Sequence, residues 1–109
     1  MLGELQVQPM VTTVVLHGDL DLVTVEALRE LLEDAVVGEP ARLVIDIADV
    51  PFVDVLSLSS ILATTDAVRE RGGMAIVRGA TTAVRRICSL LNAEDVLALE
   101  IPLQRRFAG

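Results

Sequence analysis

A short apolar run followed by a helical pattern constrains the fold of this chain more than any other feature. The run LVIDI at residues 43–47 is short and largely β-branched, as a buried strand would be. Pro51 and an acidic residue come next, and from about Ser57 to Arg71 the apolar residues recur with helical spacing. A strand followed by a helix directs the intervening loop out of one end of a sheet, which suits recognition of a phosphate or a protein.

The same alternation of strand and helix patterns runs along the whole chain. The predicted strands cover residues 4–8, 11–17, 42–47, 74–78 and 96–101. The predicted helices cover residues 24–37, residues 57–71, and a segment that begins at Thr81 or Thr82. Strands separated by helical segments of about ten to fifteen residues indicate βαβ units with right-handed crossovers, and therefore a mixed sheet packed against helices.

The composition restricts the partners and the compartment of the protein. The 109 residues suit a single domain, and the 52% of hydrophobic residues suffices for a core. The net charge is -7, so the acidic surface disfavours nucleic acid and anionic membranes as partners. No apolar run approaches the ~20 residues that span a bilayer. No export signal is visible and the lone Cys88 forms no intrachain disulfide, which together favour the cytoplasm.

No group of residues in the sequence predicts catalysis, a metal site or a cofactor. The single histidine, His17, ends a strand and is expected to be a surface or half-buried imidazole. Cys88 falls on the apolar face of its helix, which predicts a buried thiol. Because one histidine and one cysteine on different elements form neither a metal site nor a nucleophile–base pair, we expect no enzyme.

Two acidic loops are the best candidates for a binding site. Residues 18–24 (GDLDLVT) and residues 52–57 (FVDVLS) both follow the carboxyl end of a predicted strand, so we expect them to meet at one end of the sheet. Their polar residues also have local roles available. Asp21 can hold turn amides, and Asp54 or Ser57 can cap the next helix.

Two neighbouring apolar residues in the second loop indicate a protein partner. Val55 and Leu56 fall at an exposed helix start, where neither turn nor capping chemistry requires them. Apolar residues gathered on an exposed surface are typical of protein contact sites. We therefore expect this loop to touch another protein.

Five motifs in order resemble those of the STAS domain, the sulphate transporter and anti-sigma factor antagonist family. Residues 18–25 (GDLDLVTV) resemble its G-E-L-D-x-x-T-A, residues 43–47 its V-V-L-D-L strand, and residues 52–54 the F-I-D before its D-S-S-G-L signature. Residues 72–77 (GGMAIV) resemble G-G-x-L-x-L-V, and residues 84–91 echo V-x-x-x-L…G-L. The resemblance covers nearly the whole chain and implies an α/β fold. We expect a single STAS-like domain over residues 1–109, with a small mixed β-sheet and about four α-helices packed against it.

The resemblance also implies a mechanism. Free-standing members of the family bind an anti-sigma factor that is a serine kinase of the GHKL ATPase type, and this binding releases a sigma factor. The kinase phosphorylates the second serine of D-S-S-G-L, which breaks the complex. Phosphorylation adds about -1.5 to -2 charges at the interface, where nearby acidic groups would repel it.

The chain departs from the signature at the phosphorylated position. Aligned without a gap, residues 54–58 (DVLSL) take the places of D-S-S-G-L, so Leu56 stands where the phosphorylated serine is expected. A shift of one residue would put Ser57 there, but it would disturb the match at Leu58. The resemblance therefore implies either an antagonist outside phosphorylation control or a protein that has left the sigma pathway.

The leading interpretation is a cytoplasmic anti-sigma factor antagonist without enzymatic activity. Its expected contact residues are Asp21, Thr24, Asp54, Val55, Leu56 and Ser57. The two aspartates pair with basic or amide groups of the partner, the threonine fixes the first loop, and the apolar pair packs against the partner. The serine caps the helix or, in the shifted register, accepts phosphate.

Other interpretations stay open at this stage. One is a STAS scaffold or interaction subunit of a larger signalling or transport assembly. Another is a sensor of a small ligand such as a nucleotide, held by the helix N-termini at this end of the sheet. A weak homodimer is also compatible with the sequence.

Overall fold

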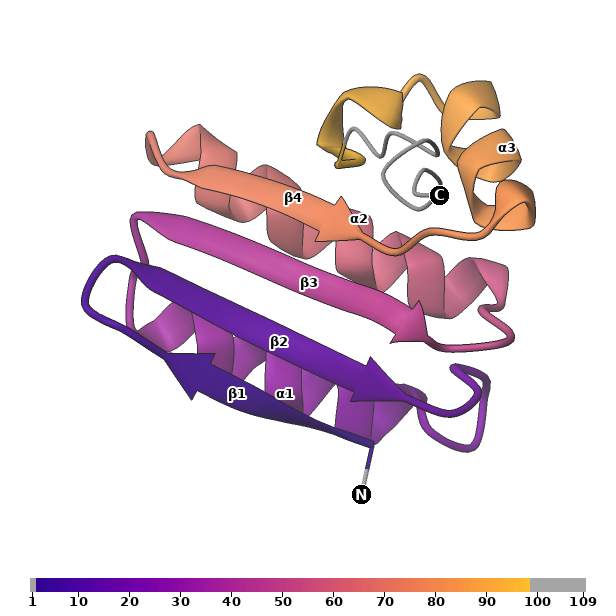
Figure 1. The fold of residues 1–109 in the computed structure, drawn as a ribbon, viewed down its shortest axis with the longest axis horizontal. Coiled ribbons are helices and arrows are strands. Elements are labelled where there is room, and N and C mark those ends of the chain that lie inside the picture. Colours follow the sequence, from indigo (N-terminus) through magenta and orange to yellow (C-terminus); the bar gives the residue numbers. More distant parts are fainter. Residues whose placement is uncertain (1, 99–109) are drawn as a thin grey trace, which may run out of the picture.

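The sheet has four strands, whose order in space follows the chain (Figure 1). The computed structural model describes residues 2–98. The strands are β1 (Gly3–Val7), β2 (Val11–His17), β3 (Arg42–Asp49) and β4 (Met74–Arg78). β1 runs antiparallel to β2, whereas β2, β3 and β4 are parallel to one another. The expected mixed sheet is confirmed, because these strands coincide with four predicted ones or differ from them by a residue or two at an end.

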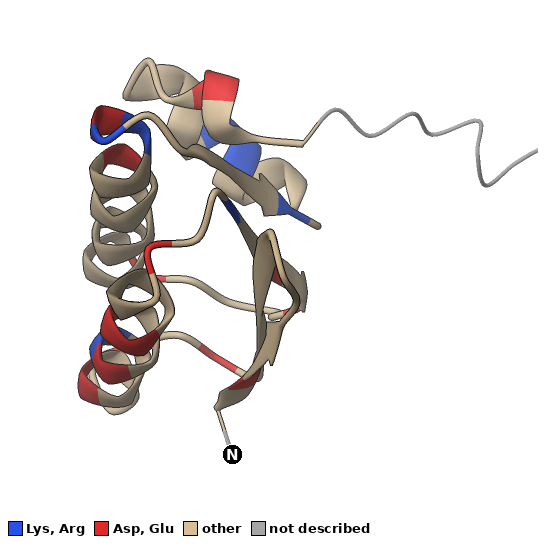
Figure 2. Cartoon of the chain, turned by 90° about the vertical axis from the view of Figure 1, so that its left-hand side faces the viewer, with Lys and Arg blue, Asp and Glu red and all other residues tan. Residues whose placement is uncertain are grey.

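Three α-helices and a short 3-10 helix complete the described part of the chain. They are α1 (Val25–Val37), α2 (Val55–Glu70), α3 (Thr82–Leu90) and η1 (Glu94–Val96). α1 and α2 cover one face of the sheet and leave the other face open (Figures 1 and 2). Within residues 2–98 the number of α-helices is three rather than the expected four or so, because the chain turns after α3 at Asn92 (φ 56°) and makes only η1.

The core lies between the helical layer and the covered face of the sheet. Side chains of β2 and β3 alternate between the two faces, as the period of a strand requires. The buried strand residues include Val14, Leu16, Leu43, Ile45 and Ile47. The helices bury Val25, Leu28, Leu32 and Ala35 from α1 and Leu58, Ile61, Thr65 and Val68 from α2. Full burial of one such aliphatic side chain stabilises the fold by about 1.5–3 kcal/mol, so these stripes hold both helices against the sheet.

The expected last strand over residues 96–101 differs from the structure. Val96 belongs to η1, and Leu97 makes only an isolated parallel bridge to Val77. The backbone N–H of Ala98 donates to the carbonyl of Val77 at 2.8 Å. The remaining residues of that prediction, 99–101, lie outside the described residues.

The start of α2 also differs from the expected one. The helix begins at Val55, two residues before the predicted start at Ser57. The Asp54 carboxylate caps it by accepting the backbone N–H of Ser57 at 2.7 Å. An acidic cap satisfies a free amide and places negative charge against the positive end of the helix dipole, which favours this earlier start.

Candidate protein-binding site

Two loops meet at the carboxyl end of the parallel strands. Leu20, in the loop after β2, forms an isolated parallel bridge with Val53, in the loop after β3. The N–H of Leu20 donates to the carbonyl of Phe52 at 2.8 Å, and the N–H of Asp54 donates to the carbonyl of Leu20 at 2.9 Å. Leu20 itself is fully buried. The expected meeting of the loops is confirmed, and these backbone bonds fix their relative position.

Asp21 and Thr24 hold the first loop together from within. Oδ1 of Asp21 accepts the N–H groups of Val23 at 3.0 Å and of Thr24 at 3.3 Å. Oγ1 of Thr24 accepts the N–H of Asp21 and donates to the carbonyl of Asp19, both at 3.0 Å. Thr24 therefore occupies the N-cap position of α1 without capping it through its side chain, and instead it braces the loop. Oδ2 of Asp21 makes no hydrogen bond within residues 2–98 and so is available to a partner.

The second loop leaves two apolar side chains in solvent at the start of α2. Val55 is 64% exposed and Leu56 is 42% exposed. Asp54 places them there, because its cap begins the helix at Val55 and turns the first residues of the helix outward. The sequence predicted exposure of this pair, and the structure agrees with that geometry.

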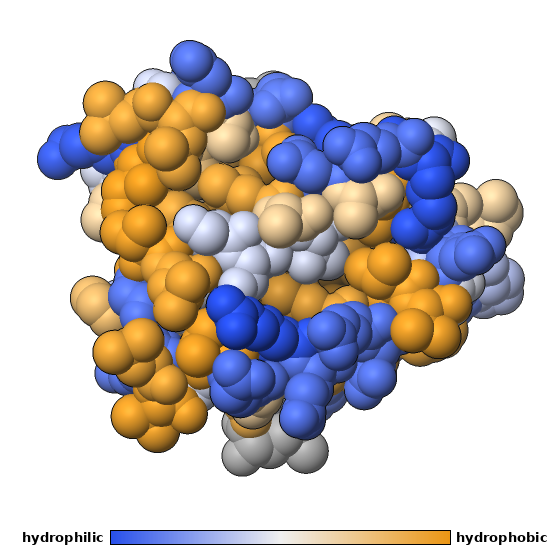
Figure 3. Space-filling view, turned by 180° about the vertical axis from the view of Figure 1, so that it is seen from behind, coloured by the Kyte–Doolittle hydropathy of each residue, from blue (hydrophilic) through white to orange (hydrophobic). Residues whose placement is uncertain are grey.

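Three further apolar residues extend this surface, although they are not among the contact residues expected from the sequence. Leu22 is 73% exposed, Val23 is 90% exposed and Phe52 is 52% exposed. We call the surface formed by Leu22, Val23, Phe52, Val55 and Leu56 the apolar rim. Figure 3 shows apolar side chains gathered in a band along the edge of the molecule that carries the loop end of the sheet, at the left of that view. The adjacent apolar residues Leu22 and Val23 in a loop were the same signal that singled out Val55 and Leu56.

Ser57 lies beneath the rim rather than on it. Its side chain is 0% exposed, and its Oγ has no hydrogen-bond partner. The expected capping role of Ser57 is wrong, because Asp54 caps the helix and Ser57 therefore falls on the inward side of the first turn. In this conformation Ser57 makes no direct contact with a partner, and its hydroxyl is closed to a kinase.

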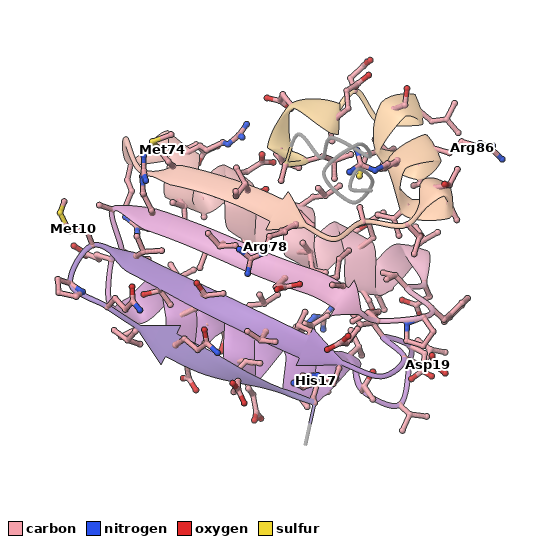
Figure 4. All side chains as sticks on the ribbon, viewed as in Figure 1. Met10, His17, Asp19, Met74, Arg78 and Arg86 are labelled. Atoms are coloured by element: carbon pink, nitrogen blue, oxygen red, sulfur yellow. The ribbon has the colours of Figure 1, made fainter. Side chains whose placement is uncertain are left out.

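Further charged groups lie on the open face of the sheet. The imidazole Nδ1 of His17 is 3.6 Å from a carboxylate oxygen of Asp49, and both side chains are well exposed. Figure 4 shows Arg78 over the open face, with His17 and Asp19 toward the loop end and Met10 and Met74 at the opposite end. The guanidinium of Arg78 contacts the Asp46 carboxylate at 2.9 Å.

The protonation of two groups reflects their surroundings. Partial burial alone would raise the pKa of Asp46, but the N–H of Ala48 and the guanidinium of Arg78 outweigh it and lower this pKa. Burial raises the pKa of the Cys88 thiol, and the charge of Glu94 adds to this effect. Cys88 is fully buried, as the sequence predicted, and a thiol held protonated in this way is a packing group rather than a reactive one.

The described residues contain neither a cluster of metal-binding side chains nor a helix that could span a membrane. Residues 2–98 contain no group of three or more His, Cys, Asp and Glu side chains placed to hold a metal ion. Over the same residues, every helix is too short or too polar to cross a bilayer.

Comparison with known proteins places the chain in a family. The family model of the STAS domain matches residues 4–107, so this chain belongs to the STAS domain family. The anti-sigma-F factor antagonist RsfB of Mycobacterium tuberculosis is 30% identical to it over 93 residues, which is 84% of this chain and 75% of that protein.

Solved structures agree with this assignment. The crystal structure of an anti-sigma factor antagonist from Mycobacterium paratuberculosis matches with a TM-score of 0.77 and 25% identity, over 92% of this chain and 86% of that chain. The unphosphorylated form of the anti-sigma factor antagonist SpoIIAA matches with a TM-score of 0.73 and 19% identity, over 98% of this chain and 96% of that chain. The second likeness is one of fold alone, and it confirms the STAS architecture expected from the sequence.

Proposed function

We propose that this protein is an anti-sigma factor antagonist, which binds an anti-sigma factor and thereby frees a sigma factor for transcription. The observation that carries the proposal is the apolar rim, which two hydrogen-bonded loops present at one end of the sheet. The similarity to RsfB and to the Mycobacterium paratuberculosis antagonist supports the same role. The protein acts in the cytoplasm and by binding, with no catalytic step of its own.

The partner in this proposal is an anti-sigma factor of the GHKL serine-kinase type. The rim supplies an apolar centre, and Asp21 and Asp54 flank it with carboxylates that can accept hydrogen bonds from basic side chains or amides. Because the chain carries a net charge of -7, a partner with a basic contact surface also gains from electrostatic steering. Burial of the rim against the partner contributes about 25 cal/mol per Å² before the costs of association.

The complex in this proposal is not controlled by phosphorylation of the antagonist. Leu56 occupies the signature position of the phosphorylated serine and has no hydroxyl. Ser57, the residue of the shifted register, is fully buried. Ser59 and Ser60 lie further along α2 from the signature position; Ser59 is exposed, and the hydroxyl of Ser60 donates to the carbonyl of Leu56 at 3.2 Å. The partner therefore meets a permanently competent rim, and the amount of this protein sets the amount of free sigma factor.

Purified proteins test the role directly. Each GHKL-type anti-sigma factor of the host is loaded with its sigma factor, and this protein is titrated into the complex while release of the sigma factor is followed by size-exclusion chromatography. We expect stoichiometric release from one of these complexes. If no anti-sigma factor of the host binds this protein at micromolar concentration, the proposed role is wrong.

A further inference from the structure

The outer surface of the helical layer carries a groove that the rim does not use. It lies between α1 and α2 and has a volume of about 610 Å³. From α1 it is lined by apolar side chains such as Leu32 and Val36, and from α2 by Ser60, Ala63, Thr64 and Ala67. A volume of this order accommodates several side chains of a bound partner.

The α2 side of the groove is small and uncharged. Its lining residues there are two alanines, a serine and a threonine, and no charged residue occurs in α2 before Asp66. Exposed helix faces ordinarily carry charged residues, so this face is unusual for a surface in contact with water alone. Small side chains let a second helix approach closely, because the distance between packed helices depends on the side chains at the contact.

The groove is continuous with the apolar rim. Leu56 of the rim, Ser60, Ala63 and Ala67 recur at intervals of three or four residues and so share one face of α2. Figure 3 shows this face as a pale strip that meets the apolar band at the left of the view, with strongly polar residues above and below it. A protein seated on Leu56 therefore lies at the mouth of the groove.

The opposite side of the groove carries a carboxylate without an ion-pair partner. Arg29 and Glu33 of α1 both line the groove. The guanidinium of Arg29 is 3.4 Å from a carboxylate oxygen of Glu26, whereas Glu33 forms no ion pair within residues 2–98. Figure 2 shows the further acidic positions of α1 on the outer side of the helical layer. The wall that α1 contributes is thus suited to a basic side chain.

We propose that this groove receives an amphipathic helix of the same anti-sigma factor, with its apolar stripe against α2 and a lysine or arginine opposite Glu33. This inference rests on the proposed function, because it extends the contact that begins at the rim. Binding of an amphipathic helix in an apolar groove is a common mode of protein recognition. The side chains that enter the groove recur at intervals of three and four residues along the bound helix.

Two neighbouring substitutions on α2 distinguish the effect of filling the groove on binding from the effect of a changed net charge. Ala67→Arg fills the groove, whereas Asp66→Arg changes the net charge more but lies outside the groove lining. Both positions are exposed, so both variants are expected to fold. Binding to the anti-sigma factor that releases its sigma factor in the titration is measured by isothermal titration calorimetry. We expect Ala67→Arg to weaken binding by about tenfold or more, and Asp66→Arg by less than about threefold.

Two more variants complete the test. Ala63→Gln fills the groove without charge and with a residue that favours helix, so it replaces Ala67→Arg if that variant is unfolded by circular dichroism. Glu33→Lys is expected to weaken binding as well, because it opposes the basic side chain of the partner.

The results that would overturn the groove proposal differ from those that would overturn the proposed function. If no anti-sigma factor of the host binds the unmodified chain, the proposed function fails and the groove proposal fails with it. If the unmodified chain and Ala67→Arg bind equally well, only the groove proposal is overturned. It is also overturned if Asp66→Arg weakens binding as much as Ala67→Arg, or if light scattering shows a dimer of this chain that Ala67→Arg breaks.

Discussion

Leu20 and Val53 form a parallel β-bridge between the two loops at the carboxyl end of the sheet. The bridge extends the pairing of β2 with β3 beyond the ends of both strands and joins loops that are more than thirty residues apart in sequence. Because the backbone fixes both loops, the exposed apolar side chains on them form one surface before any partner arrives. A preformed surface loses less conformational entropy on binding than two independent loops would.

Leu56 is expected to be essential for the contact with the anti-sigma factor. In Leu56→Asp the lost apolar burial and the desolvation of a carboxylate both oppose association, so binding measured by calorimetry should weaken by at least about a hundredfold. Val7→Asp is the matched control, since Val7 is also exposed but lies in β1 away from the loops. Tight binding by Leu56→Asp would place the contact elsewhere.

Leu22 and Val23 are expected to contribute to the same contact. The double substitution Leu22→Ser and Val23→Ser removes two highly exposed apolar side chains and leaves the hydrogen bonds of Asp21 and Thr24 in place. Binding should weaken by about tenfold or more, while the thermal midpoint of unfolding stays close to that of the unmodified chain. Unchanged affinity would show that the first loop does not contact the anti-sigma factor.

Asp54 is expected to stabilise the fold through its cap. Asp54→Ala leaves the N–H of Ser57 without its acceptor at the helix start, so the free energy of unfolding should fall by about 0.5–2 kcal/mol in urea titrations. Asp54→Asn keeps an acceptor and should restore most of this loss. If the alanine variant is as stable as the unmodified chain, the cap does not hold α2.

The buried hydroxyl of Ser57 is expected to reduce stability. Because its Oγ has no partner, replacement by alanine removes a desolvated polar group, whose cost is about 1–3 kcal/mol. Ser57→Ala should therefore raise the free energy of unfolding or leave it unchanged, whereas Ser57→Glu buries a charge and should lower it severely. A clear loss of stability in Ser57→Ala would show that the hydroxyl is bonded in solution.

Asp46 is expected to contribute to the loss of stability in acid. Its pKa in the folded protein is below the ordinary value of 3.8, so the folded state favours the carboxylate more than the unfolded chain does. This contribution is fully present above the unfolded pKa and is lost as the pH falls through the folded one. Urea titrations between pH 5 and about pH 2.5 should show a smaller decline for Asp46→Asn than for the unmodified chain. Equal declines would mean that Arg78 and the N–H of Ala48 do not stabilise the carboxylate.

The regular part of the fold could be predicted because its signals are local. The alternation in residues 11–17 and the helical stripe that begins at Val25 are properties of a few consecutive residues, and both recur in the structure. The exact pairing of Leu20 with Val53 is instead a contact between distant parts of the chain. A pattern within one loop carries no information on such a contact.

The position of Ser57 was mistaken for a related reason. The helix start was predicted from the apolar stripe, whereas the structure begins the helix two residues earlier at the Asp54 cap. Because the helix begins at Val55, Ser57 lies in its first turn, four residues before the buried Ile61, and so shares the inward face of the helix. The serine that looked like a cap or a phosphate acceptor is consequently a buried residue.

An ATP challenge of the complex with the anti-sigma factor kinase tests most directly whether phosphorylation controls this protein. The complex is incubated with ATP and magnesium, and its integrity and the intact mass of this protein are followed together. Leu56→Ser, which restores the serine of the signature, controls for kinase activity and should gain phosphate. The unmodified protein is expected to keep its mass and to remain bound. Phosphate on Ser57 together with dissociation of the complex would contradict this expectation.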